Sequence, residues 1–242
     1  METKTGTLFG IGVGPGDPDL LTIKAVKILK SVDIVFAASS IKNKHSLAVE
    51  IARPHISENA DVRTLPFQMS NNESERGKLW ENNAEIIMAE LEQGKSVAFL
   101  TLGDSLTYST YGYLLKIINQ KAPHINIVSV PGITSYQAAA ARINTPLVEG
   151  DESLLITSGA RGGDELRKYG LSADNVVLLK AYKNIADINS ALRDANLLEN
   201  SIGISKCGRK DEQIVHDVRD FETRRPDYWT LVIAKRNKAC NK

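Results

Sequence analysis

Short apolar runs alternate with amphipathic segments along the first half of the chain. The apolar runs predict strands, and the segments with apolar residues at helical spacing predict helices. The expected strands are residues 8–13, 34–37, 62–65, 96–102 and 125–130, and the expected helices are residues 21–32, 74–93, 108–119 and 133–143. Because residues 96–102 are almost wholly apolar, this strand is expected to be buried on both faces. The alternation predicts an α/β fold with a largely parallel sheet covered by helices.

The second half of the chain has a different pattern. Helical segments separate the first three of its strands, but the last strands follow each other through short connections. The expected strands are residues 154–157, 176–180, 202–205, 213–218 and 229–234. Strands joined without a crossover helix must pair antiparallel, so a second domain with a mixed sheet is expected. The polar, proline-bearing residues 121–124 are the best linker candidate, which gives an N-terminal domain of residues 1–123 and a C-terminal domain of residues 124–242.

Composition and charge narrow the classes of function. The chain has 242 residues and a formal net charge of +1, a balance that favours neither nucleic acid nor a membrane surface as partner. The first seven residues are polar, and no apolar run approaches membrane length. Cys207 and Cys240 lie far apart and form no metal or redox spacing. A cytoplasmic protein is therefore expected.

A glycine-rich stretch, residues 10–22, connects the first strand to the first helix. A strand, a glycine-rich turn and a helix in this order are typical of a ligand-binding loop. The dinucleotide fingerprint G-x-G-x-x-G does not fit, because Pro15 or Asp17 stands where its third glycine would be. Proline also lacks the backbone N–H group that could donate a hydrogen bond to a phosphate. The glycines therefore favour close approach of a ligand other than a pyrophosphate, or simply a tight turn without a ligand.

Three further loops follow predicted strands: residues 101–111, 130–136 and 156–159. Each offers small residues, hydroxyl groups and backbone amides. Taken singly, each is explained by helix capping or by an Asx turn. Ligands of open α/β sheets bind at the carboxyl ends of the strands, and the common placement of the loops there favours a ligand cleft.

The chain lacks an obvious catalytic dyad. The four histidines, His45, His55, His124 and His216, share no short metal-ligand spacing, so no metal site is expected. Ser158 lies outside any nucleophile-elbow pattern. A reaction that needs mainly alignment fits such a cleft, and methyl transfer from a sulfonium is one case. Orientation alone supplies roughly 7–11 kcal/mol of barrier reduction.

Three motifs resemble those of the tetrapyrrole (precorrin and uroporphyrinogen) methyltransferases. They are residues 12–18 (GVGPGDP), the Gly103-Asp104 pair and residues 131–135 (PGITS). They occur in the order of the family, and the resemblance covers nearly the whole chain. Residues 108–114 (YSTYGYL) and 46–48 (SLA) resemble the subfamily that methylates C20 of precorrin-2 or cobalt-factor-2 in cobalamin biosynthesis. Ser105 stands where the family usually has proline, which leaves the backbone after Asp104 less constrained.

This resemblance implies a two-domain homodimer that binds S-adenosylmethionine between the domains, releases S-adenosylhomocysteine and holds a tetrapyrrole in a trough beside it. It assigns no catalytic residue. The implied cofactor-binding residues are Pro15, Leu102, Gly103, Asp104, Thr107, Thr134, Ser135, Ala181 and Gly208. We expect the carboxylate of Asp104 to accept hydrogen bonds from the cofactor. The candidates for binding the substrate carboxylates are Lys44, Arg53, Arg76 and Lys78, although a solvated charged face explains these residues as well. The candidate dimer interface is residues 67–80, although core packing explains its large side chains as well.

Several alternatives remain at this point. Another precorrin methyltransferase or a uroporphyrinogen-III methyltransferase would have the same fold. A non-catalytic module that binds S-adenosylmethionine or a nucleotide would have the same loops. A Rossmann oxidoreductase is disfavoured by the glycine spacing. Whether the tetrapyrrole carries cobalt, and which group accepts the ring proton, are also open.

Overall fold

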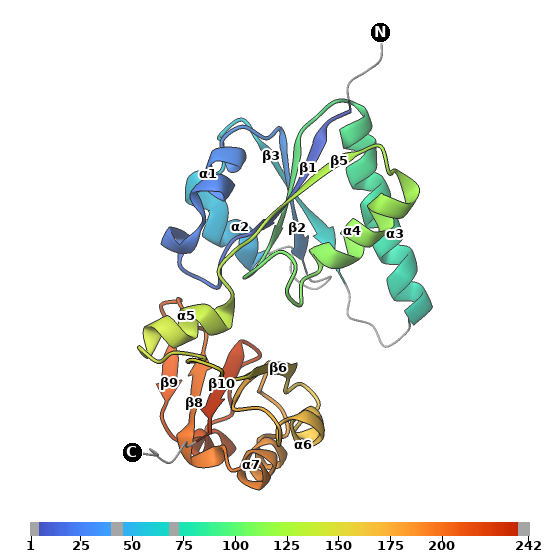
Figure 1. Ribbon diagram of the computed structural model, residues 1–242. Helices are drawn as coiled ribbons and strands as arrows, with labels where there is room; N and C mark the ends of the chain where they lie inside the picture. The colour runs from blue at the N-terminus through green and yellow to red at the C-terminus, as the bar shows by residue number, and fades with distance from the viewer. Residues whose placement is uncertain (1–4, 40–45, 68–72, 237–242) are drawn as a thin grey trace. The chain divides into compact units, whose positions relative to one another are not determined.

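Two compact units make up the chain, residues 1–134 (unit 1) and residues 135–242 (unit 2) (Figure 1). The computed structural model describes residues 5–39, 46–67 and 73–236. Each unit has its own sheet and its own hydrophobic clusters, so each is described by itself.

Five parallel strands form the sheet of unit 1, in the order β3-β2-β4-β1-β5. They are β1 (Thr7–Gly12), β2 (Ile34–Ser39), β3 (Asp61–Pro66), β4 (Val97–Thr101) and β5 (Asn126–Val130). β1 lies between β4 and β5, with Gly12 beside Thr101 and Ile11 beside Val130. Because the strands run in one direction, the loops that follow β1, β4 and β5 meet at the same edge of the sheet.

Helices cover both faces of this sheet (Figure 1). α1 (Ile23–Leu29) and α2 (Leu47–Ala52) lie on one face, and α3 (Glu73–Glu92) and α4 (Tyr111–Lys121) lie on the other. Strand side chains alternate between the two layers: Val35 and Leu100 pack with α1 and α2, whereas Phe36 and Phe99 pack with α3 and α4. Every residue of β4 is buried, as its continuous apolar run predicts.

Unit 2 contains the mixed sheet that the sequence predicts, in the order β6-β7-β10-β8-β9. Its elements are α5 (Ser135–Arg142), β6 (Leu154–Ser158), α6 (Asp164–Tyr169), β7 (Asn175–Leu179), α7 (Ile185–Asp194), β8 (Ser201–Ser205), β9 (Gln213–Val215) and β10 (Thr230–Lys235). β6 and β7 are parallel, and the remaining neighbours are antiparallel. The carboxyl ends of β6, β7 and β8 therefore share one edge with the beginning of β10. The sequence-based fold class is confirmed.

The boundary between the two units lies later in the chain than the sequence analysis predicts. Residues 121–124 span the end of α4 and the turn that leads to β5, inside unit 1, and unit 2 begins at Ser135. β5 pairs with β1 along residues 126–130, so it completes the first sheet instead of opening the second domain. The proline-bearing stretch marked a loop correctly, but strand pairing, which the local sequence does not reveal, determines the domain to which β5 belongs.

One helix also begins later than expected. Residues 108–119 were predicted to be helical, whereas α4 begins at Tyr111. Tyr108 has a φ of +50°, a left-handed conformation that a right-handed helix cannot contain. The difference therefore has a local backbone cause.

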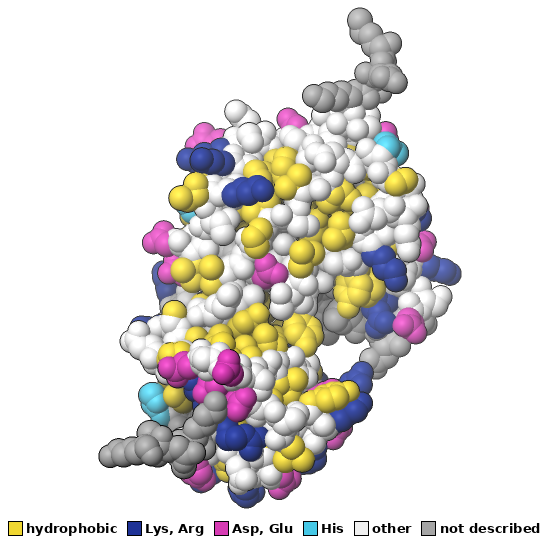
Figure 2. All heavy atoms as spheres, in the orientation of Figure 1, with side chains coloured by type: hydrophobic (Ala, Val, Ile, Leu, Met, Phe, Trp, Pro, Cys, Tyr) yellow, Lys and Arg dark blue, Asp and Glu magenta, His cyan; other side chains and the backbone are white. Residues whose placement is uncertain are grey.

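The surface carries charged side chains of both signs, and they are interspersed on the face shown in Figure 2. This mixture agrees with the formal net charge of +1. Among the residues that the structure describes, no helix is both long and apolar enough to span a bilayer.

Candidate functional site

Three loops of unit 1 interlock at the carboxyl ends of β1, β4 and β5. We call residues 13–17, 102–108 and 131–134 the loop cluster. Gly14 and Gly103 form an antiparallel bridge: Gly14 N–H donates to Gly103 O (3.1 Å), and Gly103 N–H donates to Gly14 O (2.8 Å). Both glycines have positive φ, +78° and +71°, which residues with a side chain rarely adopt. The first and second loops are thus joined by main-chain atoms.

Gly12 and Gly132 bring the third loop into the same interlock. A Cβ atom on Gly132 would lie 2.3 Å from Gly103 O and 2.7 Å from Gly12 O. A Cβ atom on Gly12 would lie 2.6 Å from Gly103 O and 2.8 Å from Gly132 N. These glycines therefore permit backbone packing between the loops. Gly10 has a different role: it leaves room for the ring of Tyr111, which packs directly over it.

Asp104 connects the second loop to the third. Its Oδ1 accepts hydrogen bonds from Leu106 N–H (2.9 Å) and Thr107 Oγ1 (3.0 Å), and its Oδ2 accepts one from Gly132 N–H (3.0 Å). Partial burial acts to raise the pKa of Asp104, but the hydrogen bonds from Gly132, Leu106 and Thr107 outweigh it and hold the pKa below its usual value. The carboxylate is therefore ionised, and its hydrogen bonds are to groups of its own loop and of the third loop. This bonding is what the Asx-turn alternative predicts, with an additional bond across to the third loop.

Ser105, the departure from the family pattern, has a defined structural role. Its side chain is fully buried, and Oγ donates to Val130 O at the end of β5 (3.1 Å). This hydrogen bond to β5 thus restrains the backbone after Asp104, where a proline ring would restrict φ. The sequence analysis expected a freer backbone at this point, and the structure provides a different constraint.

The structure brings most of the predicted cofactor residues of unit 1 together. Pro15, Leu102, Gly103, Asp104, Thr107 and Thr134 all belong to the loop cluster, and Ser135 begins α5 directly after it. Pro15 and Thr134 are buried. The Cα of Gly103 faces open space, because a Cβ atom there would meet only Ile133 O at 3.9 Å. A ligand can therefore approach the backbone at Gly103 without meeting a side chain of this residue.

The predicted substrate residues are not all at this edge of the sheet. Arg76 and Lys78 lie in the first turns of α3, which follows the carboxyl end of β3. The guanidinium of Arg76 lies 5.3 Å from the ring centroid of Trp80, and Trp80 stacks on Tyr113 at 3.9 Å. Arg53 lies between α2 and β3, on the segment that returns to the amino ends of the strands, so its assignment to the same site is not supported. Lys44 lies outside the described residues.

Ala181 and Gly208 share one edge of the unit 2 sheet. Ala181 follows β7 and its N–H donates to Thr230 O (2.9 Å), while Gly208 N–H donates to Glu212 Oε2 (2.9 Å). Arg142 Nε donates to the same Glu212 carboxylate (2.6 Å). Burial, followed by the charge of Glu212, raises the pKa of the neighbouring Cys207 thiol to about 12. Cys207 is therefore a protonated, inert thiol at neutral pH.

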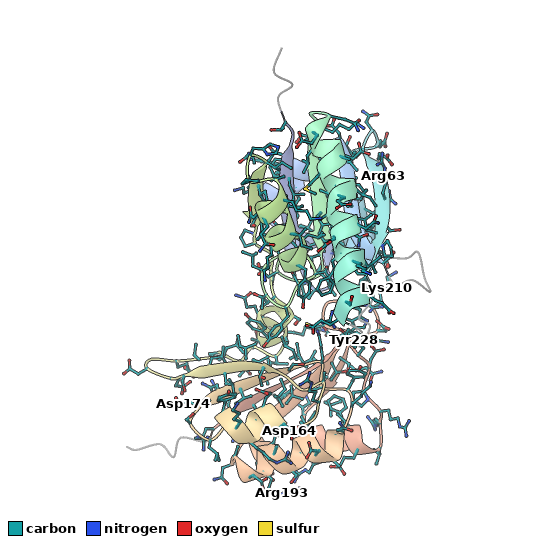
Figure 3. All side chains as sticks on the ribbon, turned by 90° about the vertical axis from the view of Figure 1, so that its right-hand side faces the viewer. Arg63, Asp164, Asp174, Arg193, Lys210 and Tyr228 are labelled. Atoms are coloured by element: carbon teal, nitrogen blue, oxygen red, sulfur yellow. The ribbon has the colours of Figure 1, made fainter. Side chains whose placement is uncertain are left out.

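The sequence analysis did not identify an aromatic group at this edge of unit 2. Tyr228 makes edge contacts with Tyr182 (5.2 Å between ring centroids) and with Trp229 (5.0 Å). In Figure 3, Tyr228 and Asp174 lie at opposite ends of the sheet. The sequence does contain adjacent aromatic residues, in the segment 226–230 (PDYWT). Aromatic residues beside a predicted strand more often belong to the hydrophobic core than to a binding site.

Comparisons with known proteins identify the family. Residues 7–220 match the Tetrapyrrole (Corrin/Porphyrin) Methylases. The chain belongs to this family. The match includes all three loops of the cluster, so the resemblance read from the sequence motifs is confirmed.

Individual relatives of this tetrapyrrole methylase agree with the assignment. The chain is 36% identical over 233 residues to the cobalt-precorrin-2 C(20)-methyltransferase of Salmonella typhimurium, covering 95% of this chain and 97% of that protein. A solved cobalt precorrin-4 methyltransferase matches with a TM-score of 0.75 at 22% identity, covering 95% of this chain and 94% of the other. A uroporphyrin-III C-methyltransferase from Thermus thermophilus, solved with S-adenosylhomocysteine, matches with a TM-score of 0.64 at 20% identity, covering 95% and 97%.

Proposed function

We propose that this tetrapyrrole methylase transfers a methyl group from S-adenosylmethionine to C20 of precorrin-2 or cobalt-precorrin-2, in cobalamin biosynthesis. The observation that carries the proposal is the 36% identity, over nearly the full length of both chains, to a relative named for that reaction. The loop cluster supports it, because the Gly14–Gly103 bridge and the Asp104–Gly132 hydrogen bond hold three loops together at one edge of the sheet.

The residues of the loop cluster fit S-adenosylmethionine as cofactor. The open face at Gly103 allows the ligand to approach the main chain closely. Asp104 accepts three hydrogen bonds, and a carboxylate has about four acceptor positions, so it keeps some capacity for an ammonium or hydroxyl group. Its lowered pKa keeps a negative charge where a cationic ligand would lie. We propose that Pro15, Leu102, Gly103, Asp104, Thr107 and Thr134 bind this cofactor, with Ser135, Ala181 and Gly208 as the contributors from unit 2.

The protein's part in such a reaction is alignment. When bound, S-adenosylmethionine supplies a methyl group already activated on a sulfonium. The main-chain bridge between Gly14 and Gly103 and the Asp104–Gly132 hydrogen bond fix the loops, so little conformational freedom is lost when a ligand binds. A fixed near-attack geometry supplies roughly 7–11 kcal/mol of the barrier reduction. We propose that Arg76, on α3, binds a carboxylate of the substrate and that Lys78, two residues later, contributes to the same contact.

The test is methyl transfer from S-adenosylmethionine with a ¹³C-labelled methyl group, on the metal-free and on the cobalt-bound ring. We expect calorimetry to find one cofactor site per chain and NMR to find one new methyl group at C20. A methyl group at another ring position would assign the chain to a different precorrin or uroporphyrinogen-III methyltransferase. Cofactor binding without transfer to either ring would leave a non-catalytic binding module.

We also propose that the chain is a homodimer, as the family resemblance implies. Phe67 is not available for an interface, because it is buried and packs edge-on against Phe99 (5.8 Å). Within the described part of residues 67–80, Trp80 is the better candidate, and its ring stacks on Tyr113, which is 42% exposed. Light scattering at micromolar concentration should give about twice the chain mass of 26.5 kDa, and a mass equal to one chain would contradict the proposal.

A further inference from the structure

Tyr108 has a strained backbone at the edge of the loop cluster. Six non-glycine residues in the described part of the chain have positive φ, and three of them are asparagines, which tolerate this conformation. The other three are Tyr108 (+50°), Lys180 (+58°) and Lys206 (+54°). Lys180 and Lys206 directly follow β7 and β8, and Tyr108 lies in the loop between β4 and α4. Strain in bulky residues concentrates at functional positions, so its location here calls for a ligand-based explanation.

The surrounding hydrogen bonds hold Tyr108 in this conformation. Before it, Thr107 Oγ1 is fixed on the Asp104 carboxylate. After it, Ser109 Oγ donates to Ser105 O. Ser105 is itself anchored to Val130 O. The turn from residue 104 to residue 109 is thus hydrogen-bonded on both sides of Tyr108, and α4 begins after it, at Tyr111.

This turn exposes apolar side chains. Leu106 is 60% exposed and Tyr108 is 58% exposed, whereas Tyr111 at the start of α4 is fully buried. Unit 1 has five large apolar side chains that are exposed within its described residues, and three of them, Leu106, Tyr108 and Tyr113, lie between residues 106 and 113. Apolar groups gathered beside a ligand loop indicate a binding surface.

We propose that Tyr108, together with Leu106, contacts the face of the tetrapyrrole acceptor and helps to determine acceptor specificity. This inference rests on the proposed function. For transfer, the acceptor carbon must lie about 3–3.5 Å from the methyl donor, so the acceptor surface must continue directly from the cofactor loops. Tyr108 follows Thr107, a proposed cofactor residue, and an aromatic ring can pack against the pyrrole-derived rings of a tetrapyrrole. The polar groups of the cofactor, in contrast, would form hydrogen bonds with main-chain atoms and Asp104.

Three variants test the inference: Tyr108→Gly, Tyr108→Phe and, as a matched control, Tyr169→Ala, which removes a 45% exposed tyrosine at the end of α6. The measurements are the acceptor KM, the Kd for S-adenosylmethionine by calorimetry, the Kd for uroporphyrin by fluorescence, and the Tm. Uroporphyrin serves as a probe because it is a coloured octacarboxylate tetrapyrrole that binds without a reaction.

For Tyr108→Gly we expect the acceptor KM and the uroporphyrin Kd to rise about tenfold, with the cofactor Kd unchanged. The Tm should stay the same or rise, because glycine adopts positive φ without steric cost. Tyr108→Phe should recover most of the acceptor affinity, since the ring remains. Tyr169→Ala should leave all binding constants unchanged.

Each contrary result has a distinct meaning. Unchanged uroporphyrin binding by Tyr108→Gly, in a chain that still transfers methyl groups, would overturn this inference and leave the proposed function standing. A fall in Tm together with weaker cofactor binding would give Tyr108 a purely structural role and would also overturn it. If the unaltered chain binds S-adenosylmethionine but neither uroporphyrin nor precorrin-2, the proposed function itself fails, and this inference fails with it.

Discussion

Replacing Gly132 by alanine should lower kcat/KM for methyl transfer at least about a hundredfold and destabilise unit 1 by about 2–4 kcal/mol. The new Cβ would lie within 2.7 Å of atoms of Gly103 and Gly12, and all of these are main-chain atoms that cannot rotate away. Overpacking of a tight site costs about 1–3 kcal/mol or more. Separating the loops by about 1 Å is enough to lose a factor of roughly a hundred in rate. The measurements are steady-state kinetics and urea unfolding.

Gly77→Ala is the matched control. Gly77 lies inside α3, and a Cβ atom there would meet nothing within 4 Å. Alanine at this position should stabilise the chain by about 0.5–1 kcal/mol through helix propensity and leave the kinetics unchanged. If Gly132→Ala behaves like Gly77→Ala, the loop cluster is more tolerant than its packing indicates, and its assignment as the cofactor site loses its main support.

Replacing Asp104 by alanine should weaken cofactor binding ten- to a hundredfold and lower the free energy of unfolding by about 2 kcal/mol. The stability loss is expected because three protein donors, Leu106 N–H, Thr107 Oγ1 and Gly132 N–H, would lose their acceptor. Asp104→Asn should be nearly as severe, because an amide NH₂ would face at least one of these donors. Calorimetry with S-adenosylmethionine and urea unfolding measure the two effects separately.

The control for Asp104 is Asp217→Ala in unit 2. Asp217 also accepts a hydrogen bond from a backbone N–H two residues later, that of Arg219 (3.0 Å), but it lies outside the loop cluster. Its loss should cost about 1 kcal/mol of stability without changing cofactor affinity. A variant Asp104→Ala that loses stability while its cofactor Kd stays unchanged would make Asp104 a structural residue only.

The pH dependence of this contribution has a definite sign. The pKa of Asp104 in the folded chain lies below its usual value of 3.8, so folding favours the ionised carboxylate. Its contribution to stability is therefore present above pH 3.8 and is lost as the pH falls through the lowered folded pKa.

Periodicity predicted the elements of this chain well, because burial on both faces of a parallel sheet leaves a continuous apolar run such as β4. It also placed the candidate loops at strand ends, and three of the four now form the loop cluster. It could not assign β5 to a domain, because the pairing of residues 7–11 with residues 126–130 is a long-range property. It placed Arg53 with the substrate site because sequence proximity to β2 does not reveal which end of the sheet a returning segment reaches.

Finer features of the site were also beyond the sequence. The hydrogen bond between Asp104 and Gly132 joins residues that are 28 positions apart, and no local sequence pattern predicts it. The hydroxyl of Ser105 replaces a constraint that the family obtains from proline, and this becomes clear only when Val130 O is seen beside it. Tyr108 was expected to begin a helix because its neighbours have helical spacing. Local rules fail most often where strain serves a ligand, so this failure is informative.

The main-chain character of the loop cluster has an evolutionary consequence. Gly12 and Gly132 pack main chain against main chain, and Gly14 and Gly103 have positive φ, so a side chain at any of these positions should disturb the interlock, while their outward neighbours are free to vary. Substitutions at Leu106 and Tyr108 can alter the surface next to the loops without disturbing the interlock. A duplicated gene could therefore acquire a new acceptor through a few mutations in residues 106–113 and keep its methyl donor. Such separation of an invariant backbone from variable side chains would allow one ancestral scaffold to supply successive steps of a biosynthetic route.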